Sequence, residues 1–346
     1  MNHEKLIFMH HPTGLNIIAI GGSSGSGAVL SRLLPSLPAD IPAAILVATH
    51  LARHASGYLA ERLSGRGAMR IANAVDCQLI EHGHVYIAPP DRHLLVIDGT
   101  VRLGSGPREN MARPAIDPLF RSAAMYHGPR VTGVVLSGYL DDGASGLRAI
   151  KSCGGTTVVQ DPEDAQVEEM PLAALAASDV DHVATADALP GLLTALAQEQ
   201  RSGAHTPSDA LRLEVEIAAG SRLGSETLMA IADPAALSCP ACNGVLSEIR
   251  GARPLRYRCQ IGHGYTAQAL TARSDKVNEA IRVAMRIMEE RVTLVGRMAR
   301  DARGAGRDAV AELYDARVSE YRGYAATLRE AAVAMMRSAR DVGQEN

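Results

Sequence analysis

Aromatic residues are scarce in this chain: tryptophan is absent, and only two phenylalanines and nine tyrosines occur in 346 residues. Because base-stacking and sugar-stacking surfaces depend on aromatic rings, a surface of that kind is not expected. The formal net charge is −3, so the chain as a whole has no electrostatic pull towards nucleic acid or anionic membranes. These two features exclude nucleic acid from the expected partners.

Long apolar runs are also missing. No run approaches the length of a membrane-spanning helix, and residues 1–14 lack the apolar core of a signal peptide. Of the five cysteines, three are grouped in the C-terminal third, while Cys77 and Cys153 stand alone. That usage is typical of a reducing compartment. We therefore expect a cytoplasmic protein that does not insert into a membrane.

Apolar residues nevertheless make up 47% of the chain, enough for a sizeable core. Short β-branched runs alternate with helix-like segments, and such alternation predicts an α/β fold with a doubly wound, mostly parallel sheet. The runs are residues 17–20, 43–49, 131–138 and 156–160. Asp98-Gly99 separates two strand-like halves at 94–103, which predicts one antiparallel hairpin within this fold.

The stretch 17–27 passes from an apolar run into small residues and then into a helix-like segment. Gly21, Ser23 and Gly25 satisfy the G-x-S-x-G pattern of a nucleophile elbow. The same cluster also fits a phosphate-binding turn before a helix, or a plain turn. The stretch alone does not decide between these three.

Polar residues just past the ends of other predicted strands favour the elbow. Ser23, His50 and one of Asp141 and Asp142 follow three strands, and parallel strands present such residues at one edge of the sheet. A serine nucleophile needs a base, and the base needs a carboxylate to orient it. A dinucleotide site instead needs an acidic residue where His50 stands. We predict a serine, histidine and aspartate triad.

Five motifs between Leu15 and Leu193 carry a family resemblance. They are Ile18–Gly25, Thr49–Leu51, His84–His93, Arg113–Phe120 and Leu136–Gly143. These segments resemble the catalytic domain of chemotaxis protein-glutamate methylesterases of the CheB type. The resemblance implies that Ser23 is the nucleophile, His50 the general base and Asp142 the orienting acid. The Ser24 N–H is expected to bind the oxyanion, and the resemblance places Tyr139 beside it.

The resemblance implies a serine hydrolase that demethylates glutamate methyl esters on chemoreceptor-like proteins and can deamidate glutamine there. It implies no catalytic cofactor, and partners that are methylated receptors and other chemosensory proteins. Ser26, Tyr139 and Leu140 depart from the family pattern, which leaves two alternatives: a diverged hydrolase of another ester or amide, and a non-catalytic signalling adaptor. The family's usual receiver domain is not expected, because only a short segment precedes the first strand.

The C-terminal third has a metal-ligand pattern. Cys239, Cys242, Cys259 and His263 follow the spacing C-x2-C-x16-C-x3-H, which predicts a closed, structural Zn²⁺ site in a small module. The segment resembles the zinc-ribbon-like extension of some methylesterase homologues that lack a receiver domain.

Apolar residues at helical spacing then predict an α-helical hairpin, broken near Gly304 to Gly306. This hairpin either packs within the chain or offers a surface for a partner or a second copy. The expected domains are a catalytic domain at 1–198, a linker at 199–237, the zinc module at 238–272 and the helical hairpin at 273–346.

Overall fold

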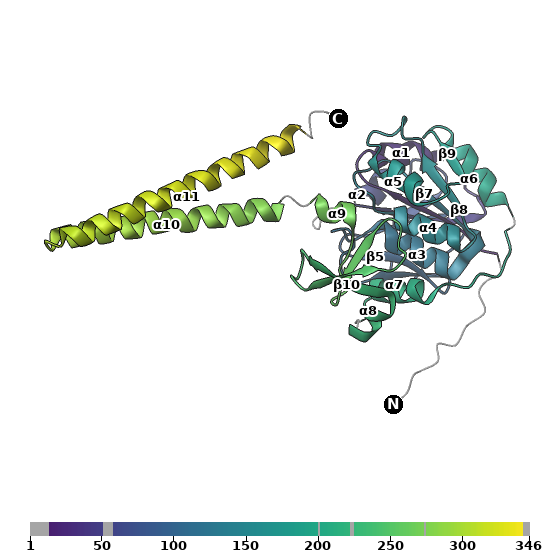
Figure 1. Ribbon diagram of the computed structural model, residues 1–346. Helices are drawn as coiled ribbons and strands as arrows, with labels where there is room; N and C mark the ends of the chain where they lie inside the picture. The colour runs from purple at the N-terminus through teal and green to yellow at the C-terminus, as the bar shows by residue number, and fades with distance from the viewer. Residues whose placement is uncertain (1–13, 51–57, 200, 222–224, 273–274, 342–346) are drawn as a thin grey trace. The chain divides into compact units, whose positions relative to one another are not determined.

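The computed structural model describes residues 14–50, 58–199, 201–221, 225–272 and 275–341 (Figure 1). The chain forms two compact units, Met1–Leu270 and Thr271–Asn346. Within the described ranges, no helix is both long enough and apolar enough to cross a membrane.

A seven-stranded sheet lies at the centre of the first unit. Its strand order is β3-β4-β2-β1-β7-β8-β9, and all neighbouring strands are parallel. The strands are β1 (Asn16–Gly22), β2 (Ala43–Thr49), β3 (Arg70–Asn73), β4 (His84–Ile87), β7 (Val131–Val135), β8 (Thr156–Gln160) and β9 (His182–Ala184). In this order, β2, β4 and β3 lie on one side of β1, and β7, β8 and β9 lie on the other. Sheets of this kind bind ligands at the carboxyl edge, where the order reverses.

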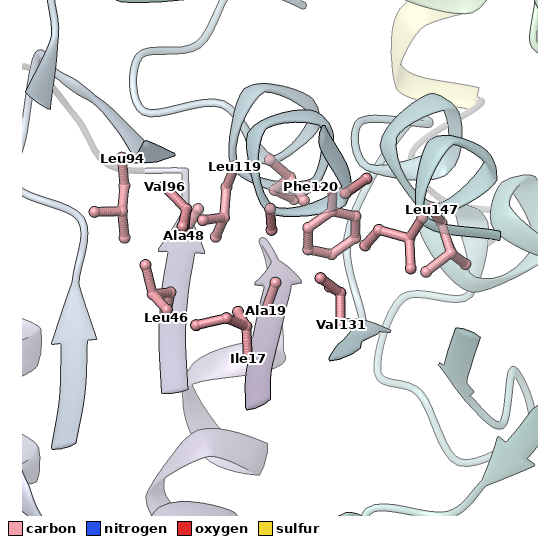
Figure 2. Packing of buried hydrophobic residues seen from close by; sticks show 14 of the residues in the cluster. Ile17, Ala19, Leu46, Ala48, Leu94, Val96, Leu119, Phe120, Val131 and Leu147 are labelled. Carbon is pink, nitrogen blue, oxygen red and sulfur yellow. The ribbon is translucent and has the colours of Figure 1, made fainter. Parts of the chain in front are cut away.

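Side chains of β1 alternate between two hydrophobic layers, as the period of a strand requires. Ile17 and Ala19 face α3 (Ile116–His127) and α4 (Ala144–Ser152), and Figure 2 shows Leu119 and Phe120 of α3 directed towards the sheet. The second layer contains Ile18 and Ile20 with residues of α1 (Ser26–Leu33), α2 (Tyr58–Leu63) and α6 (Leu189–Gln198). The predicted doubly wound fold is confirmed.

The predicted hairpin is formed by β5 (His93–Ile97) and β6 (Thr100–Gly104), which pair antiparallel. Asp98 and Gly99 both have positive φ, 48° and 70°. Two left-handed residues in succession are what a two-residue type I′ turn needs. The hairpin contributes Leu94 and Val96 to the first layer (Figure 2).

Residues 199–237, predicted as a linker, contain α7 (Asp209–Ala219), α8 (Ser225–Ile231) and most of β10 (Ala232–Ser238). Ser208 caps α7 by accepting a hydrogen bond from the Leu211 N–H at 3.2 Å. Leu211 and Val215, one turn apart, are buried in the first layer. The linker interpretation is wrong for α7. The Gly, Ser and Pro residues that flank this short helix give residues 199–237 a linker-like composition, which hides the helix.

The predicted zinc module is a four-stranded antiparallel sheet in the order β10-β11-β12-β13. Its other strands are β11 (Val245–Ile249), β12 (Arg256–Cys259) and β13 (Gly264–Thr266), and α9 (Ala267–Thr271) follows. The sheet begins earlier than predicted, at Ala232, and lies in the same compact unit as the parallel sheet.

The second unit consists of α10 (Asp275–Gly304) and α11 (Asp308–Asp341), which confirms the predicted hairpin (Figure 1). Small residues are buried along these helices, among them Ala299, Ala302, Ala311 and Ala325. Leu294 and Leu313 remain exposed. The two helices therefore pack on each other and keep apolar side chains on their outer surface.

Candidate active site

Two neighbouring strands deliver Ser23 and His50 to the same edge. β1 and β2 are parallel, and their last residues, Gly22 and Thr49, are partners in the ladder. Ser23 and His50 are each the next residue along the chain. Because paired strands lie roughly 4.8 Å apart, the two residues start from adjacent positions. The Ser23 N–H also donates to the Ser137 carbonyl oxygen at 2.9 Å, which ties it to the end of β7.

The turn that carries Ser23 is closed by Ser26. The Ser26 hydroxyl donates to the Ser23 carbonyl oxygen at 2.6 Å, and the Ser26 side chain is buried. Gly25 has φ 82°, and a Cβ there would lie 2.5 Å from the Ser137 hydroxyl oxygen, so glycine is required. Ser26 departs from the family pattern, and its buried side chain stabilises the turn.

His50 and Asp142 form the central pair of the site. The His50 Nε2 atom lies 2.7 Å from Asp142 Oδ2, and the carboxylate is almost fully buried. Oδ2 also accepts the Ile116 N–H at 2.8 Å, while Oδ1 accepts the Asn110 side-chain amide at 3.1 Å and the Asp117 N–H at 3.3 Å. Neutral His50 therefore carries its proton on Nε2, which leaves Nδ1 as the basic nitrogen.

Burial by itself would raise the pKa of the Asp142 carboxyl. The hydrogen bond and charge of His50, together with the Ile116 N–H and the Asn110 amide, outweigh burial and hold this pKa below its usual value. Asp142 is consequently an anion in a buried position, where it faces His50 Nε2.

The two adjacent aspartates have different partners. Asp141, the alternative for the acid of the triad, accepts the Thr266 hydroxyl at 2.6 Å, whereas Asp142 contacts His50. The geometry therefore favours Asp142. Asp141 is buried against the C-terminal module, and burial raises the pKa of Asp141 to about 6 despite the bond from Thr266; neighbouring Asp142 adds to the rise.

Asp141→Asn should stabilise the protein at neutral pH. The folded-state pKa of about 6 exceeds the usual 3.8, so the folded chain binds more protons between these values and loses stability as pH rises through them. Asparagine keeps an acceptor for Thr266 and removes this cost, which by linkage is about 2 to 3 kcal/mol. Urea unfolding should show the gain at pH 7 and almost none at pH 4. An equal change at both pH values would contradict the assignment.

The structure does not join Ser23 to His50 by a hydrogen bond within the described residues. Ser24 is exposed next to Ser23, and Tyr139 is 55% exposed. In the part of the chain that the structure describes, the backbone N–H groups of Ser24 and Tyr139 have no hydrogen-bond partner, whereas that of Leu140 donates to Glu169 Oε2 at 2.8 Å. Leu51, part of the predicted histidine motif, lies outside the described residues.

Asn110 and Thr266 belong to this site but were not predicted. Asn110 has a left-handed backbone, φ 47°, a conformation that asparagine tolerates well. It contacts both Asp142 and the Thr266 N–H, and the second contact joins residues far apart in the chain. No local pattern marks such a contact; the only sequence signal was an asparagine ahead of the Arg113-Pro114 motif.

The four predicted metal ligands come together in the small antiparallel sheet. Their ligand atoms all lie within 4.8 Å of one another. Cys242 Sγ is 3.7 Å from Cys259 Sγ, and His263 Nδ1 is 3.4 Å from Cys259 Sγ and 3.7 Å from Cys239 Sγ. Zn–S bonds of about 2.3 Å in a tetrahedron give S···S separations of roughly 3.8 Å. The cluster therefore has the spacing and donor set that zinc requires.

The described fold is a doubly wound α/β protein with a serine, a histidine and a buried aspartate near the carboxyl ends of its strands. The chain belongs to the CheB methylesterase family, whose model matches residues 18–193. The match lies in the parallel-sheet part and does not reach the metal cluster or the helical hairpin.

Individual relatives agree with this assignment. A protein-glutamate methylesterase/protein-glutamine glutaminase of Methanosarcina mazei is 38% identical over 164 residues, 45% of this chain and 45% of that protein. A putative protein of the same name from Leptospira interrogans is 37% identical, over 53% of this chain and 97% of that protein. The chain spans about half the length of the first of these relatives.

A solved structure is similar as well. The crystal structure of the Thermotoga maritima CheB methylesterase catalytic domain aligns with a TM-score of 0.51 at 32% identity, covering 52% of this chain and 98% of that one.

Proposed function

We propose that this chain is a serine hydrolase that removes methyl groups from glutamate methyl esters of chemoreceptor-like proteins. The observation that carries the proposal is the contact of His50 Nε2 with Oδ2 of the buried Asp142 at 2.7 Å, at the edge where Ser23 follows β1. The family membership and the names of the relatives support the same chemistry.

In the proposed mechanism, Asp142 holds the His50 proton on Nε2, so Nδ1 accepts the proton of the Ser23 hydroxyl as Oγ attacks the ester carbonyl carbon. The N–H groups of Ser24 and Tyr139 stabilise the oxyanion, since neither is engaged elsewhere in the described part of the chain. His50 then gives its proton to the methoxide, and methanol leaves. Water, activated by His50, hydrolyses the acyl-enzyme to glutamate.

The remaining parts of the proposal concern domains, metal and partners. Residues 1–198 carry the reaction, and Cys239, Cys242, Cys259 and His263 bind a structural Zn²⁺. Methylated receptors and other chemosensory proteins are the partners, in the cytoplasm, and the C-terminal helices offer a surface for a second copy. Glutamine deamidation at the same site is included, because the same triad can attack an amide carbonyl.

The direct test is methanol release from receptor membranes that carry methylated glutamates, using the full chain. Methanol should appear in proportion to enzyme, and mass spectrometry should find free glutamate at the former ester positions. If methanol is not released while small esters are hydrolysed, the chain is a diverged hydrolase; Tyr139 and Leu140, which depart from the family pattern, are then the positions to exchange. If neither the receptor methyl esters nor small esters are hydrolysed, the non-catalytic adaptor alternative is favoured.

Asp142→Asn should lower the hydrolysis rate by about 10⁴-fold, the effect of the same change in a serine protease triad. The asparagine NH₂ group would face N–H donors at either oxygen position. At the Oδ2 position these are His50 and the Ile116 N–H, and at the Oδ1 position the Asn110 amide. The His50 proton then moves to Nδ1, and the base is lost. Initial rates measure the effect, with Asp141→Asn as the matched control that should retain activity. Comparable losses in both variants would contradict the assignment of the acid.

A further inference from the structure

The C-terminal module lies directly against the loop that supports the catalytic acid. Asn110, in the loop between β6 and α3, donates its backbone N–H to the Gly264 carbonyl oxygen at 2.9 Å. Its side-chain Oδ1 accepts the Thr266 N–H at 2.9 Å, and its Nδ2 donates to Asp142 Oδ1 at 3.1 Å. Both Gly264 and Thr266 belong to β13. One asparagine therefore connects the module to the carboxylate that orients His50.

The orientation of the Asn110 amide is fixed by chemistry. The Thr266 backbone group can only donate, so it must face the oxygen of the amide, and the amide nitrogen must then face Asp142. Of the two donors to Asp142 Oδ1, the Asn110 amide is the closer, at 3.1 Å against 3.3 Å for the Asp117 N–H. The Asp142 carboxylate can only accept, so it selects the same orientation, and the Thr266 N–H holds the amide in place against it.

Buried charges clamp the same loop to the module. Glu109, which precedes Asn110, forms ion pairs with Arg121 of α3 and with Arg258 of β12, the second at 3.0 Å. Glu214 of α7 also pairs with Arg121 and Arg258, at 3.1 and 3.2 Å. All four side chains are almost fully buried. Removing any one of these four side chains would leave a buried charge unpaired and destabilise the contact between the loop and the module.

The metal cluster borders the strand that contacts Asn110. Cys259 is the last residue of β12, and His263 immediately precedes β13. The turn between them is closed by hydrogen bonds from Gly262 N–H to the Cys259 carbonyl oxygen at 2.8 Å and from Cys259 N–H to the His263 carbonyl oxygen at 3.1 Å. A metal ion held by both residues would fix the start of β13, and with it the two groups that bind Asn110.

We propose that Asn110 is a positioning residue for the catalytic acid, and that the C-terminal module, through the backbone of β13, holds Asn110 in the orientation that serves Asp142. The module is then a working part of the esterase site rather than an appended domain. This inference rests on the proposed function for its effect on activity, but the arrangement of Asn110, Asp142 and His50 is tested separately.

The first measurement is the rate at which a fluorophosphonate labels Ser23 in the full chain. Asn110→Ala should lower this rate about tenfold or more, the effect of losing one hydrogen bond to a buried charge. Asn73→Ala, at an exposed asparagine at the end of β3, is the matched control and should label like the wild type. A chelator should slow the wild type to a similar extent and slow Asn110→Ala little further. If the chelator slows labelling of Asn110→Ala by the same factor as it slows labelling of the wild type, the proposed coupling through Asn110 is wrong.

The second measurement is the low-field ¹H NMR signal of the His50 Nε2 proton, which reports the bond to Asp142 without requiring catalysis. The signal should be present in the wild type, lost or shifted in Asn110→Ala, and kept in Thr266→Val. That variant removes the hydroxyl contacts to Asp141 and to the Ala269 N–H but keeps the backbone N–H that binds Asn110. An unchanged signal in Asn110→Ala would overturn the proposal. If the wild type shows the signal but is never labelled, the proposed function fails and the positioning role of Asn110 is still decided by this comparison.

Where Asn110→Ala does not fold, Asn110→Gly replaces it. Glycine readily adopts the left-handed backbone of this position, φ 47°, and has no side chain to donate to Asp142. Loss of the His50 signal in a folded Asn110→Gly chain supports the proposal, and retention of the wild-type signal overturns it.

Discussion

Ser23→Ala should lower the rate of methyl-ester hydrolysis on the order of 10⁶-fold, the loss seen when the nucleophile of a serine hydrolase is removed. The reason is that, in the proposed mechanism, the acyl-enzyme forms on the Ser23 hydroxyl. The turn itself should survive, since it is held through the Ser23 backbone: the N–H donates to Ser137 and the carbonyl oxygen accepts from Ser26. The hydroxyl makes none of these bonds. Activity and fold are therefore separable at this position.

Methanol release and fluorophosphonate labelling measure the loss, and circular dichroism with thermal unfolding shows whether the fold is kept. Ser36→Ala, at an exposed serine after α1, is the matched control and should match the wild type in all assays. Methanol release by Ser23→Ala at more than a trace would refute the assigned nucleophile. An unchanged signalling phenotype in cells that carry Ser23→Ala would favour the adaptor alternative.

The rule that parallel strands present their carboxyl ends at one edge accounts for the predicted placement of Ser23 and His50 next to each other. The two residues could be placed without side-chain information, because the apolar runs before them predict strands. The last residues of these strands, Gly22 and Thr49, are partners in the structure. The choice between Asp141 and Asp142 could not be made this way. Adjacent residues in a loop differ only in what each meets after folding, here Thr266 for one and His50 for the other.

Contacts between distant segments account for what was missed. Asn110 and Thr266 are joined across the boundary between the predicted catalytic domain and the predicted zinc module. The two segments were treated as separate because the residues between them have a linker-like composition. Their connection depends on buried ion pairs of Glu109 and Arg258, and single charged residues of this kind are indistinguishable from surface residues in a sequence.

The cluster of three cysteines and His263 could be predicted because its sequence information is local. Cys239 and Cys242 lie on one short knuckle, closed by hydrogen bonds from Cys239 N–H to the Gly244 carbonyl oxygen at 2.7 Å and from Asn243 N–H to the Cys239 carbonyl oxygen at 2.8 Å. Cys259 and His263 lie on a second one. Burial, with the charge of Arg258, lowers the pKa of His263 and keeps the imidazole in the neutral form that binds metal. Knuckle spacing is visible in a sequence, whereas the docking of the module is not.

Cys239→Ser should remove the metal and unfold the module, because zinc binding supplies about 10 to 16 kcal/mol in small zinc-dependent folds. The apolar core of the module is small, built around Cys239, Leu246, Cys259 and Tyr265, and cannot replace that energy. Zinc per chain, measured by atomic emission, should fall from one to near zero, and the melting temperature of the first unit should drop.

Cys77→Ser, at an exposed cysteine outside the cluster, is the matched control and should keep one zinc. If Cys239→Ser retains stoichiometric zinc and the wild-type melting temperature, the assigned ligand set is wrong. If it loses zinc without any loss of thermal stability, the metal does not stabilise this module.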